Sequence, residues 1–350
     1  MKVLQVIDKL AVGGAEKVLV DLSNILYEHK HHVEVLCLLT PSVLDKQLHA
    51  DIQIIYLHRG FKYNPIKLVK LYKILNRYDI IHIHCRQVMR YVGLLLFLPK
   101  FLLKFKVIFH DHYGKIKEDK SINPLLKRQL SLIDTYVGVS NELVMWFKKI
   151  SKSVNAVMLS NIVRVGAFYD KTQKFDEKIK IVIVGNFRAQ KNYEFALDLL
   201  AELPNVFELT IIGSIVDQLY YERIIKNAKE RELNNRLIIK NSITNVQKEL
   251  VAYDLAIHTA TSETGPLVAI EYLAMQLPFI MFNTGEVAKQ IQPELSDFIV
   301  DTQSITLWKE KINYVLTNKD SYRNKINSIF LQNFSEENYY HKCLTIYQNI

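Results

Sequence analysis

The chain has 350 residues, of which 49% are hydrophobic, and a net charge of +9. This length suits two domains, and the apolar content is enough for each domain to bury its own core. The three cysteines have no C-x-x-C spacing, which argues against a disulfide framework or a zinc ribbon and favours a reducing cytoplasm. The first apolar run ends at Asp8, too early for a secretory signal, and the longest run, Tyr91–Pro99, is about half as long as a membrane-spanning helix.

The charge is divided unevenly along the chain. Residues 1–165 carry 25 Lys and Arg against 13 Asp and Glu, a net of +12, whereas residues 166–350 carry 20 against 23, a net of −3. A basic half is typical of a protein that meets nucleic acid, anionic lipid or a phosphorylated substrate. No RNP, helix-turn-helix or zinc-finger pattern supports nucleic acid. The stretch KFLLKFKVIF, Lys100–Phe109, suits a lipid headgroup interface, and suits equally an exposed helix end that leads into a core strand.

Strand-like apolar runs alternate with helical patterns along the whole chain. This alternation predicts parallel sheets that helices cover on both faces. Between Ser160 and Lys180 the periodicity fades and the charge rises, which indicates a linker. The predicted strands fall at residues 3–8, 32–39, 52–57, 80–85, 106–110 and 135–140, then at 179–185, 208–213, 236–240, 255–260 and 278–282.

We therefore predict an α/β protein with two doubly wound, Rossmann-like domains, residues 1–163 and 164–332, that face each other across a cleft. Ligands are expected in this cleft, at the carboxyl ends of the strands. Residues 333–350 are predicted to form a closing helix that returns to the first domain, with Ser335 as its N-cap.

The first loop contains a glycine pair, Gly13 and Gly14, between a strand and a helix. Glycines allow a ligand to approach the backbone, and a helix N-terminus attracts an anion, so the loop is a candidate phosphate site. It lacks both the G-x-G-x-x-G pattern of dinucleotide-binding proteins and a Walker lysine. A simple turn would also explain the pair.

Two histidine pairs stand at predicted strand ends, His82 with His84 and His110 with His112. Period-two spacing places each pair on one face of its strand. A neighbouring cysteine and aspartate are compatible with a metal site, but the fixed ligand spacings of zinc sites are missing, and hydrogen bonding to a polar ligand or simple packing is favoured. His110 is the candidate for contact with a reacting group in the cleft.

A cationic loop opens the second half of the chain. A predicted strand ends at Gly185, and Arg188 and Lys191 follow before a helix that begins near Asn192. Two cations at the carboxyl end of a strand can neutralise a diphosphate without a metal.

Two glutamates, Glu263 and Glu271, flank a loop that turns into an apolar helix. The loop amides from Gly265 to Val268 would face phosphate charge, one carboxylate would meet the sugar of a nucleotide sugar, and the other would accept both ribose hydroxyls. A pair of exposed helix-end glutamates is the alternative, which the apolar surroundings of Glu271 disfavour.

Three motifs in this order resemble family 4 glycosyltransferases of the GT-B fold, of the bacterial polysaccharide and lipopolysaccharide type. They are GGAE at Gly13–Glu16, VG…QKN at Val184–Asn192, and E-x7-E from Glu263 to Glu271. GGAE alone is weak evidence, but the three together are specific, and the resemblance extends over nearly the whole chain. It implies a retaining enzyme that uses a nucleotide-sugar donor.

The resemblance also implies residue roles. Glu263, His110 and Lys191 are the implied catalytic residues, and Glu271 is expected to hold the ribose. Asn186 stands where the family often has arginine, so Arg188 is expected to replace it, and Thr264 and Gln276 occupy frequent glycine positions. The implied donor-binding set is Gly13, Gly14, Gly185, Asn186, Arg188, Lys191, Thr264, Gly265, Pro266, Leu267, Val268 and Glu271.

The implied reaction moves a hexosyl unit to a hydroxyl of a saccharide or glycolipid acceptor in cell-surface polysaccharide biosynthesis. The first domain would bind the acceptor and the second the donor, with no cofactor or metal and no nucleic acid partner. The charge of the first half predicts an anionic, lipid-linked acceptor and peripheral binding at the inner face of the plasma membrane by an otherwise cytoplasmic protein. The alternatives are a nucleotide-sugar 2-epimerase of the same fold and a non-catalytic nucleotide-sugar-binding protein.

Overall fold

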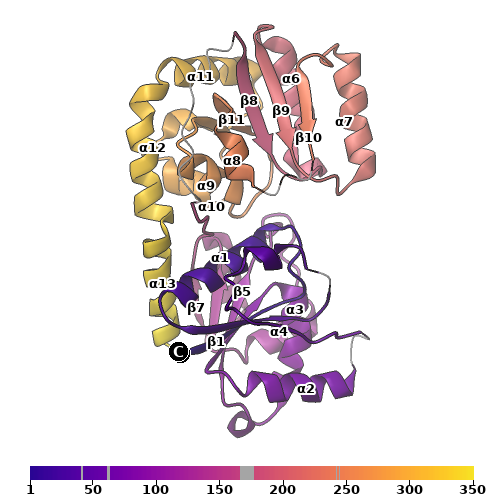
Figure 1. Cartoon of the computed structure of the whole chain (residues 1–350), viewed down its shortest axis with the longest axis vertical. Helices are drawn as coiled ribbons and strands as arrows, with labels where there is room; N and C mark the ends of the chain where they lie inside the picture. The colour runs from indigo at the N-terminus through magenta and orange to yellow at the C-terminus, as the bar shows by residue number, and fades with distance from the viewer. Residues whose placement is uncertain (41, 61–63, 166–176, 242, 244) are drawn as a thin grey trace. The chain divides into compact units, whose positions relative to one another are not determined.

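The computed structural model describes residues 1–40, 42–60, 64–165, 177–241, 243 and 245–350, which form two compact units (Figure 1). Unit 1 contains residues 1–162 and 335–350, and unit 2 contains residues 163–334. Of the predicted linker, residues 166–176 lie outside the described residues. The end of the chain thus belongs to the same unit as its first strand.

A parallel sheet of seven strands forms the centre of unit 1, in the order β3-β2-β1-β4-β5-β6-β7. The strands are β1 (Lys2–Ile7), β2 (His32–Cys37), β3 (Ile54–Tyr56), β4 (Ile80–His84), β5 (Lys106–Asp111), β6 (Thr135–Gly138) and β7 (Asn155–Met158). The helices are α1 (Gly14–Glu28), α2 (Pro65–Leu75), α3 (Arg86–Val92), α4 (Pro124–Leu130), α5 (Asn141–Ile150) and α13 (Glu336–Gln348), with the short 3-10 helices η1 (Leu44–Gln47), η2 (Gly93–Phe97) and η3 (Lys100–Leu102).

Side-chain caps fix the starts of several of these helices. Asn64 and Asn123 each accept two backbone N–H bonds from the first turn of α2 and α4, and each precedes a proline at the first helical position. Proline is suited to that position because its missing N–H would have no intrahelical partner there. Ser335 accepts the N–H of Asn338, so the predicted N-cap of the last helix is confirmed.

Unit 2 has a six-stranded parallel sheet in the order β10-β9-β8-β11-β12-β13. Its strands are β8 (Ile179–Val184), β9 (Phe207–Ile212), β10 (Leu237–Lys240), β11 (Leu255–His258), β12 (Phe279–Phe282) and β13 (Ile299–Val300). Its helices are α6 (Tyr193–Glu202), α7 (Gln218–Glu230), α8 (Val246–Leu250), α9 (Leu267–Ala274), α10 (Gly285–Ile291), α11 (Ile305–Thr317) and α12 (Lys319–Phe334), with the 3-10 helices η4 (Ala189–Lys191) and η5 (Ser296–Phe298).

The predicted fold class, two doubly wound α/β domains, is confirmed. Each sheet is covered by helices and carries an apolar core; in unit 2 the rings of Phe195, Phe282 and Trp308 pack together with centroids 5.0–5.4 Å apart. The prediction missed β7 and β13. Both are edge strands, and β7 is only partly buried while β13 has two residues, so neither gives a long apolar run.

The order of the strands reverses once in each sheet. In unit 1 the reversal lies between β1 and β4, and in unit 2 it lies between β8 and β11. Loops that leave the carboxyl ends of two such strands run in opposite directions and open a crevice, where doubly wound sheets bind their ligands. The loops after β8 and β11 are therefore the expected position of a ligand-binding site in unit 2.

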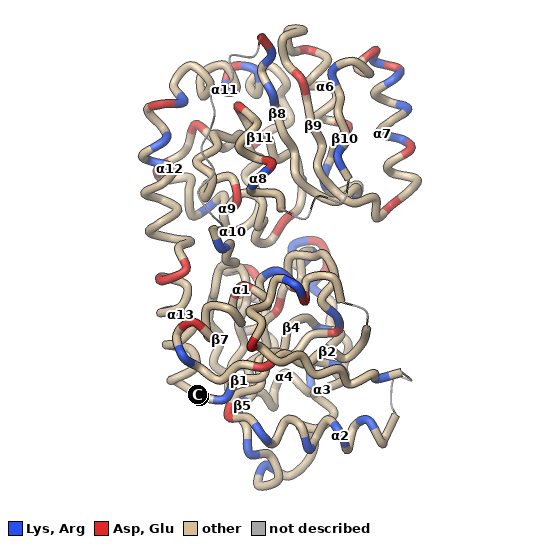
Figure 2. Tube along the Cα trace, in the orientation of Figure 1, with Lys and Arg blue, Asp and Glu red and all other residues tan. Residues whose placement is uncertain are grey.

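Among the described residues, no helix combines the length and the hydropathy that crossing a bilayer requires. Figure 2 shows lysines spread along α2 of unit 1, a helix that has no acidic residue in its range. This distribution agrees with the charge asymmetry of the sequence.

Candidate active site

The loop after β8 presents Lys191 at the reversal of the unit 2 sheet. The chain leaves β8 through Gly185, forms the single turn η4 and enters α6 after Asn192, whose φ of 53° is left-handed. Asparagine tolerates this conformation better than most residues do. The Tyr193 hydroxyl donates to the Gly185 carbonyl over 2.5 Å, which closes the loop on itself.

The loop after β11 brings Glu263 to the same place. The Thr259 hydroxyl donates to the carbonyl of Lys191 over 2.8 Å, and the N–H of Thr261 donates to the carbonyl of Gln190 over 3.0 Å. The N–H of Glu263 donates to the hydroxyl of Thr284 over 3.2 Å. Three strand ends of one sheet, those of β8, β11 and β12, thus hold the two loops together.

Lys191 and Glu263 form an ion pair, with 2.5 Å between the Nζ and Oε1 atoms and only 16% and 14% of their side chains exposed. Burial by itself raises the pKa of Glu263, but the ammonium of Lys191 and the ring of His258 outweigh burial and lower the pKa to about 2. The carboxylate is therefore ionised at neutral pH. A negative and a positive group lie side by side at the sheet reversal.

His258 is a third member of this group that the sequence analysis did not assign. It is the last residue of β11, it is buried, and its Nε2 atom lies 3.8 Å from Oε1 of Glu263. Burial lowers the pKa of His258, so the ring is neutral at pH 7. A polar residue at the end of the apolar run LAIH was the signal that could have revealed it.

The remaining donor-site candidates of unit 2 lie on the same two loops and on α9, which follows the second loop. Arg188 is exposed at the start of η4, and Asn186 accepts the N–H of Ser214 over 3.2 Å, which ties the loop after β8 to the loop after β9. Glu271 is the half-buried fifth residue of α9. The predicted row of amide donors needs one correction: Pro266 is the N-cap of α9 and has no N–H, so the backbone donors there belong to Gly265, Leu267 and Val268.

Two glycines outside the predicted set allow this packing. A Cβ on Gly213 would overlap the carbonyl of Gly185, so only glycine lets the ends of β9 and β8 approach so closely. Gly285 has a φ of 79°, and a Cβ there would lie 2.9 Å from Pro266. Their isolated positions in the sequence gave no sign of these contacts.

In unit 1, the predicted phosphate loop is the N-terminus of α1. Gly14 is the exposed first residue of the helix, and Gly13 precedes it in extended conformation. A Cβ on Gly13 would collide with the carboxylate of Glu16. Burial raises the pKa of this carboxyl. Lys191 and the glycine pair belong to different units.

The four predicted histidines of unit 1 meet in one cluster, and His110 lies inside it with no exposed surface. His112 is the partly exposed member. The contact between His110 and a sugar stays a prediction. In the structure its ring faces other histidines.

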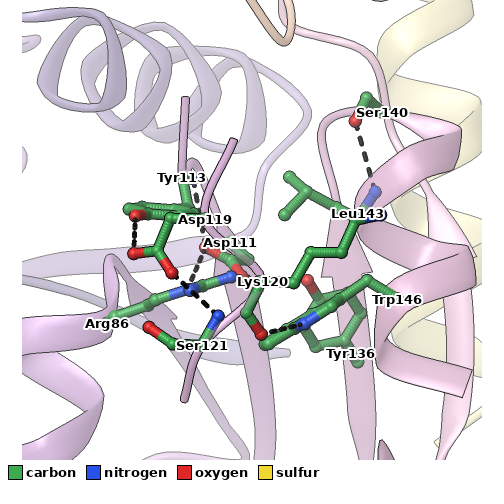
Figure 3. Close-up of polar contacts among 10 residues, drawn as sticks. All are labelled: Arg86, Asp111, Tyr113, Asp119, Lys120, Ser121, Tyr136, Ser140, Leu143 and Trp146. Atoms are coloured by element: carbon green, nitrogen blue, oxygen red, sulfur yellow. Dashed lines mark hydrogen bonds and ion pairs between the residues drawn. The ribbon is translucent and has the colours of Figure 1, made fainter. Parts of the chain in front are cut away.

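Beside this cluster, Arg86 fixes the segment that follows β5 (Figure 3). Its Nε and Nη2 atoms donate to the buried Asp111 carboxylate over 2.8–3.2 Å, and its guanidinium lies 4.0 Å from the ring centroid of Tyr113 and 4.4 Å from that of Trp146. Tyr136 also donates to Asp111, over 2.9 Å. A bidentate pair stacked on aromatic rings holds this segment in one arrangement.

A shallow cavity of about 310 Å³ is a weaker candidate. Lys2, His32, Glu34, Arg77 and Tyr78 line it. Lys2 and His32 begin β1 and β2, so the cavity lies at the amino ends of the strands. Doubly wound sheets bind ligands at the opposite edge.

Two Rossmann-like units with parallel sheets form the architecture of the GT-B glycosyltransferases. Residues 167–329 match the family model "Glycosyl transferases group 1", and residues 12–155 match the model "Glycosyltransferase Family 4". The two matches cover most of both units, and the chain belongs to this family of glycosyltransferases.

Two relatives are similar along most of their length. A 41.2 kDa protein in the cps region of Klebsiella pneumoniae is 24% identical over 345 residues, covering 85% of this chain and 89% of that protein. The N-acetyl-alpha-D-glucosaminyl L-malate synthase of Bacillus anthracis is 22% identical over 374 residues, covering 97% of this chain and 95% of that protein.

Solved structures share the fold over the full chain. Anabaena HepE in complex with UDP-glucose has a TM-score of 0.79 at 15% identity, with 100% of both chains covered. The lipopolysaccharide outer core galactosyltransferase WaaB has a TM-score of 0.73 at 16% identity, again with 100% of both chains covered. At these identities the likeness establishes the fold alone.

Proposed function

We propose that this glycosyltransferase moves a hexosyl unit from a nucleotide diphosphate sugar to a hydroxyl of a saccharide or glycolipid acceptor, with retention of the anomeric configuration. The observation that carries the proposal is the Lys191–Glu263 pair at the sheet reversal of unit 2. A similar structure, that of HepE, holds UDP-glucose, which supports a nucleotide sugar as the donor.

The donor would bind at the carboxyl ends of β8 and β11. Lys191 supplies a cation for the diphosphate, and Arg188, exposed on the same loop, supplies a second. The N-terminus of α9 adds backbone N–H donors and the positive end of a helix dipole. The half-buried Glu271 on α9 is proposed to hold the ribose hydroxyls.

The largest change of charge in the transfer step occurs on the leaving diphosphate. As the bond between the sugar and the diphosphate breaks, negative charge grows on the phosphate oxygens, and preorganised cations and amides stabilise it. We propose that Lys191, Arg188 and the α9 N-terminus stabilise this negative charge without a metal ion. Glu263, ionised because of its neighbours, faces the positive charge that develops on the sugar ring.

In the structure Lys191 is paired with Glu263 rather than with a phosphate. A bound diphosphate would therefore draw the ammonium toward its own oxygens and leave the Glu263 carboxylate closer to the sugar. This exchange of partners keeps both groups charged throughout. It also gives two oppositely charged residues a function in a site with so little exposed surface.

Unit 1 is proposed to bind an anionic, lipid-linked acceptor at a membrane surface. Large apolar side chains are exposed on it: Phe101 by 83%, Ile66 by 77% and Val69 by 56%. The hydroxyl of Tyr72 on α2 donates to the carbonyl of Leu102 over 3.0 Å, which joins α2 to η3. We call this the basic apolar surface; it consists of Ile66, Val69, Phe101 and Leu102 with the exposed lysines Lys70, Lys73, Lys100 and Lys104.

Apolar side chains among lysines suit an anionic lipid interface, because the apolar groups enter the acyl boundary while the lysines meet the headgroups. The stretch from Lys100 to Phe109 accordingly divides in two: residues 100–104 are largely exposed, and residues 105–109 lead into the buried strand β5. We propose that the protein works in the cytoplasm, at the inner face of the plasma membrane.

The proposal is tested by product analysis. The purified chain is incubated with a panel of nucleotide sugars, selected by the rise in melting temperature that each one causes, with and without glycolipid acceptors. Mass spectrometry should detect an acceptor enlarged by one hexosyl unit, and NMR should give an anomeric configuration equal to that of the donor. Conversion of the donor into an isomer of the same mass would instead indicate an epimerase, and binding without any conversion would indicate a non-catalytic protein.

A further inference from the structure

Four histidine rings lie on one face of the unit 1 sheet, at the ends of two neighbouring strands. His84 of β4 is the direct register partner of His110 of β5, and His82 and His112 each stand two residues away on the same face. The centroid distances are 4.6 Å for His82–His84, 5.3 Å for His84–His110 and 4.2 Å for His110–His112. His82, His84 and His110 are at most 1% exposed.

Hydrogen bonds from the neighbouring elements orient two of the rings. Gln5 of β1 accepts from Nε2 of His84 over 2.9 Å through its Oε1 atom, so this nitrogen carries the proton and Nδ1 has the lone pair. The hydroxyl of Tyr347, from α13, lies 2.7 Å from Nδ1 of His82 and accepts from the side-chain amide of Gln5 over 3.2 Å. Nδ1 of His84 lies 3.1 Å from Nε2 of His112.

Three ring nitrogens inside the cluster have no hydrogen-bond partner among the described residues: Nε2 of His82 and both nitrogens of His110. Buried polar atoms are nearly always paired with protein, water or an ion, so three such atoms in one place point to a bound water or ion. Each of the three histidines can offer one nitrogen such that these atoms lie within 4.8 Å of one another.

We propose that His82, His84 and His110 bind one transition-metal ion, with Zn²⁺ as the expected occupant, and that His112 lies within reach as a fourth ligand. Three histidines with an open fourth position form a known zinc donor set. The donors are imidazoles alone, because the adjacent Asp111 carboxylate is held by Arg86. Such a set favours zinc, copper or nickel over magnesium and calcium.

The surroundings fit this role. Metal-binding histidines usually donate their second ring N–H to a fixed acceptor, and Gln5 and Tyr347 occupy those positions for His84 and His82. The register of β4 and β5 places the three rings on one face of the sheet, where each can turn one nitrogen toward a common point. The partly exposed His112 marks the side from which an ion can enter.

A metal here would join β4 to β5 and, through Tyr347, would fix α13 onto the sheet. It would also bind the ring of His110, the residue that the sequence predicts to contact the sugar. His110 can bind the metal or contact the sugar, but not both at once. The site is separate from the diphosphate chemistry proposed for unit 2 and does not depend on it.

The test measures metal binding by the whole chain without any nucleotide sugar. The protein is stripped with a chelator, reloaded with Zn²⁺ and dialysed, and its zinc content is measured by mass spectrometry. Reloading with Co²⁺ provides a second readout through visible absorption bands. His110→Ala is compared with His341→Ala, which removes an exposed histidine of α13, and circular dichroism checks that each variant is folded.

We expect one zinc per chain in the wild type and in His341→Ala, and at least about a tenfold weaker zinc affinity in His110→Ala. Should His110→Ala not fold, X-ray absorption of the wild-type zinc protein replaces it, with three or four nitrogen ligands expected at about 2.0–2.1 Å. Substoichiometric zinc in the wild type, unchanged zinc in folded His110→Ala, or a sulfur ligand would each overturn the proposal. Failure of the zinc proposal would leave the proposed glycosyl transfer intact, because transfer is assayed separately by its products.

Discussion

Nζ of Lys191 lies 2.5 Å from Oε1 of Glu263, and these residues stand 72 positions apart on the loops that follow β8 and β11. The two loops meet because the strand order of the unit 2 sheet reverses between those strands. A cation and an anion are thus placed together by the topology of one domain.

The depressed pKa of Glu263 predicts how stability depends on pH. An unfolded glutamate titrates near 4.3, whereas the folded pKa is about 2, so the stabilisation is complete above about pH 4.5 and is lost as the pH falls toward 2. We expect Glu263→Gln to lower the free energy of unfolding by about 3 kcal/mol at pH 7 and pH 5, and by roughly half as much at pH 3. Urea unfolding at the three pH values measures this.

The matched control is Glu202→Gln, which alters an exposed carboxylate of the same unit and should change stability little at any of these pH values. An effect of Glu263→Gln that is as large at pH 3 as at pH 7 would contradict the assigned pKa.

Cys85 lies between β4 and α3 with a φ of 72° and a ψ of 144°, a conformation that glycine adopts far more easily. We expect Cys85→Gly to raise the free energy of unfolding by about 1 kcal/mol, since relief of strain exceeds the packing of one half-buried thiol. Cys85→Val should be destabilising because a β-branched side chain fits this backbone worst. The denaturant midpoints of the two variants measure these changes in stability. Equal midpoints would contradict the backbone strain assigned to Cys85.

The basic apolar surface predicts binding to anionic vesicles. Phe101→Ser should weaken co-sedimentation with phosphatidylserine-containing vesicles severalfold, because it removes the most exposed aromatic side chain of that surface. Leu219→Ser is the matched control, since Leu219 is exposed by 79% but belongs to unit 2. Equal losses in the two variants, or equal binding to neutral vesicles, would count against a specific lipid interface.

The fold and the main site loops could be predicted from the sequence because they depend on local patterns. Buried strands give continuous apolar runs, and Lys191 and Glu263 each follow such a run. Their pairing depends on which strands are neighbours, and that order comes from the packing of whole domains. The short edge strands β7 and β13 carry too few buried residues to be recognised.

Other features depend on backbone geometry that the sequence does not reveal. Gln276, which occupies a frequent glycine position of the family, has a φ of 50°, so the usual glycine there has a conformational reason. The close approach of Gly213 to Gly185 and the burial of His110 among other histidines depend on contacts between distant segments. Single residues in the sequence carry no sign of such contacts.

The central claim, that unit 2 binds a nucleoside diphosphate through Lys191, is tested most directly by calorimetric titration. The ligand is the member of a nucleoside diphosphate panel that most raises the melting temperature of the wild type. We expect Lys191→Met to weaken its binding at least about tenfold, equivalent to about 1.4 kcal/mol, while Lys226→Met, which alters an exposed lysine of unit 2, leaves it unchanged. Equal affinities in Lys191→Met and in the wild type would contradict the claim.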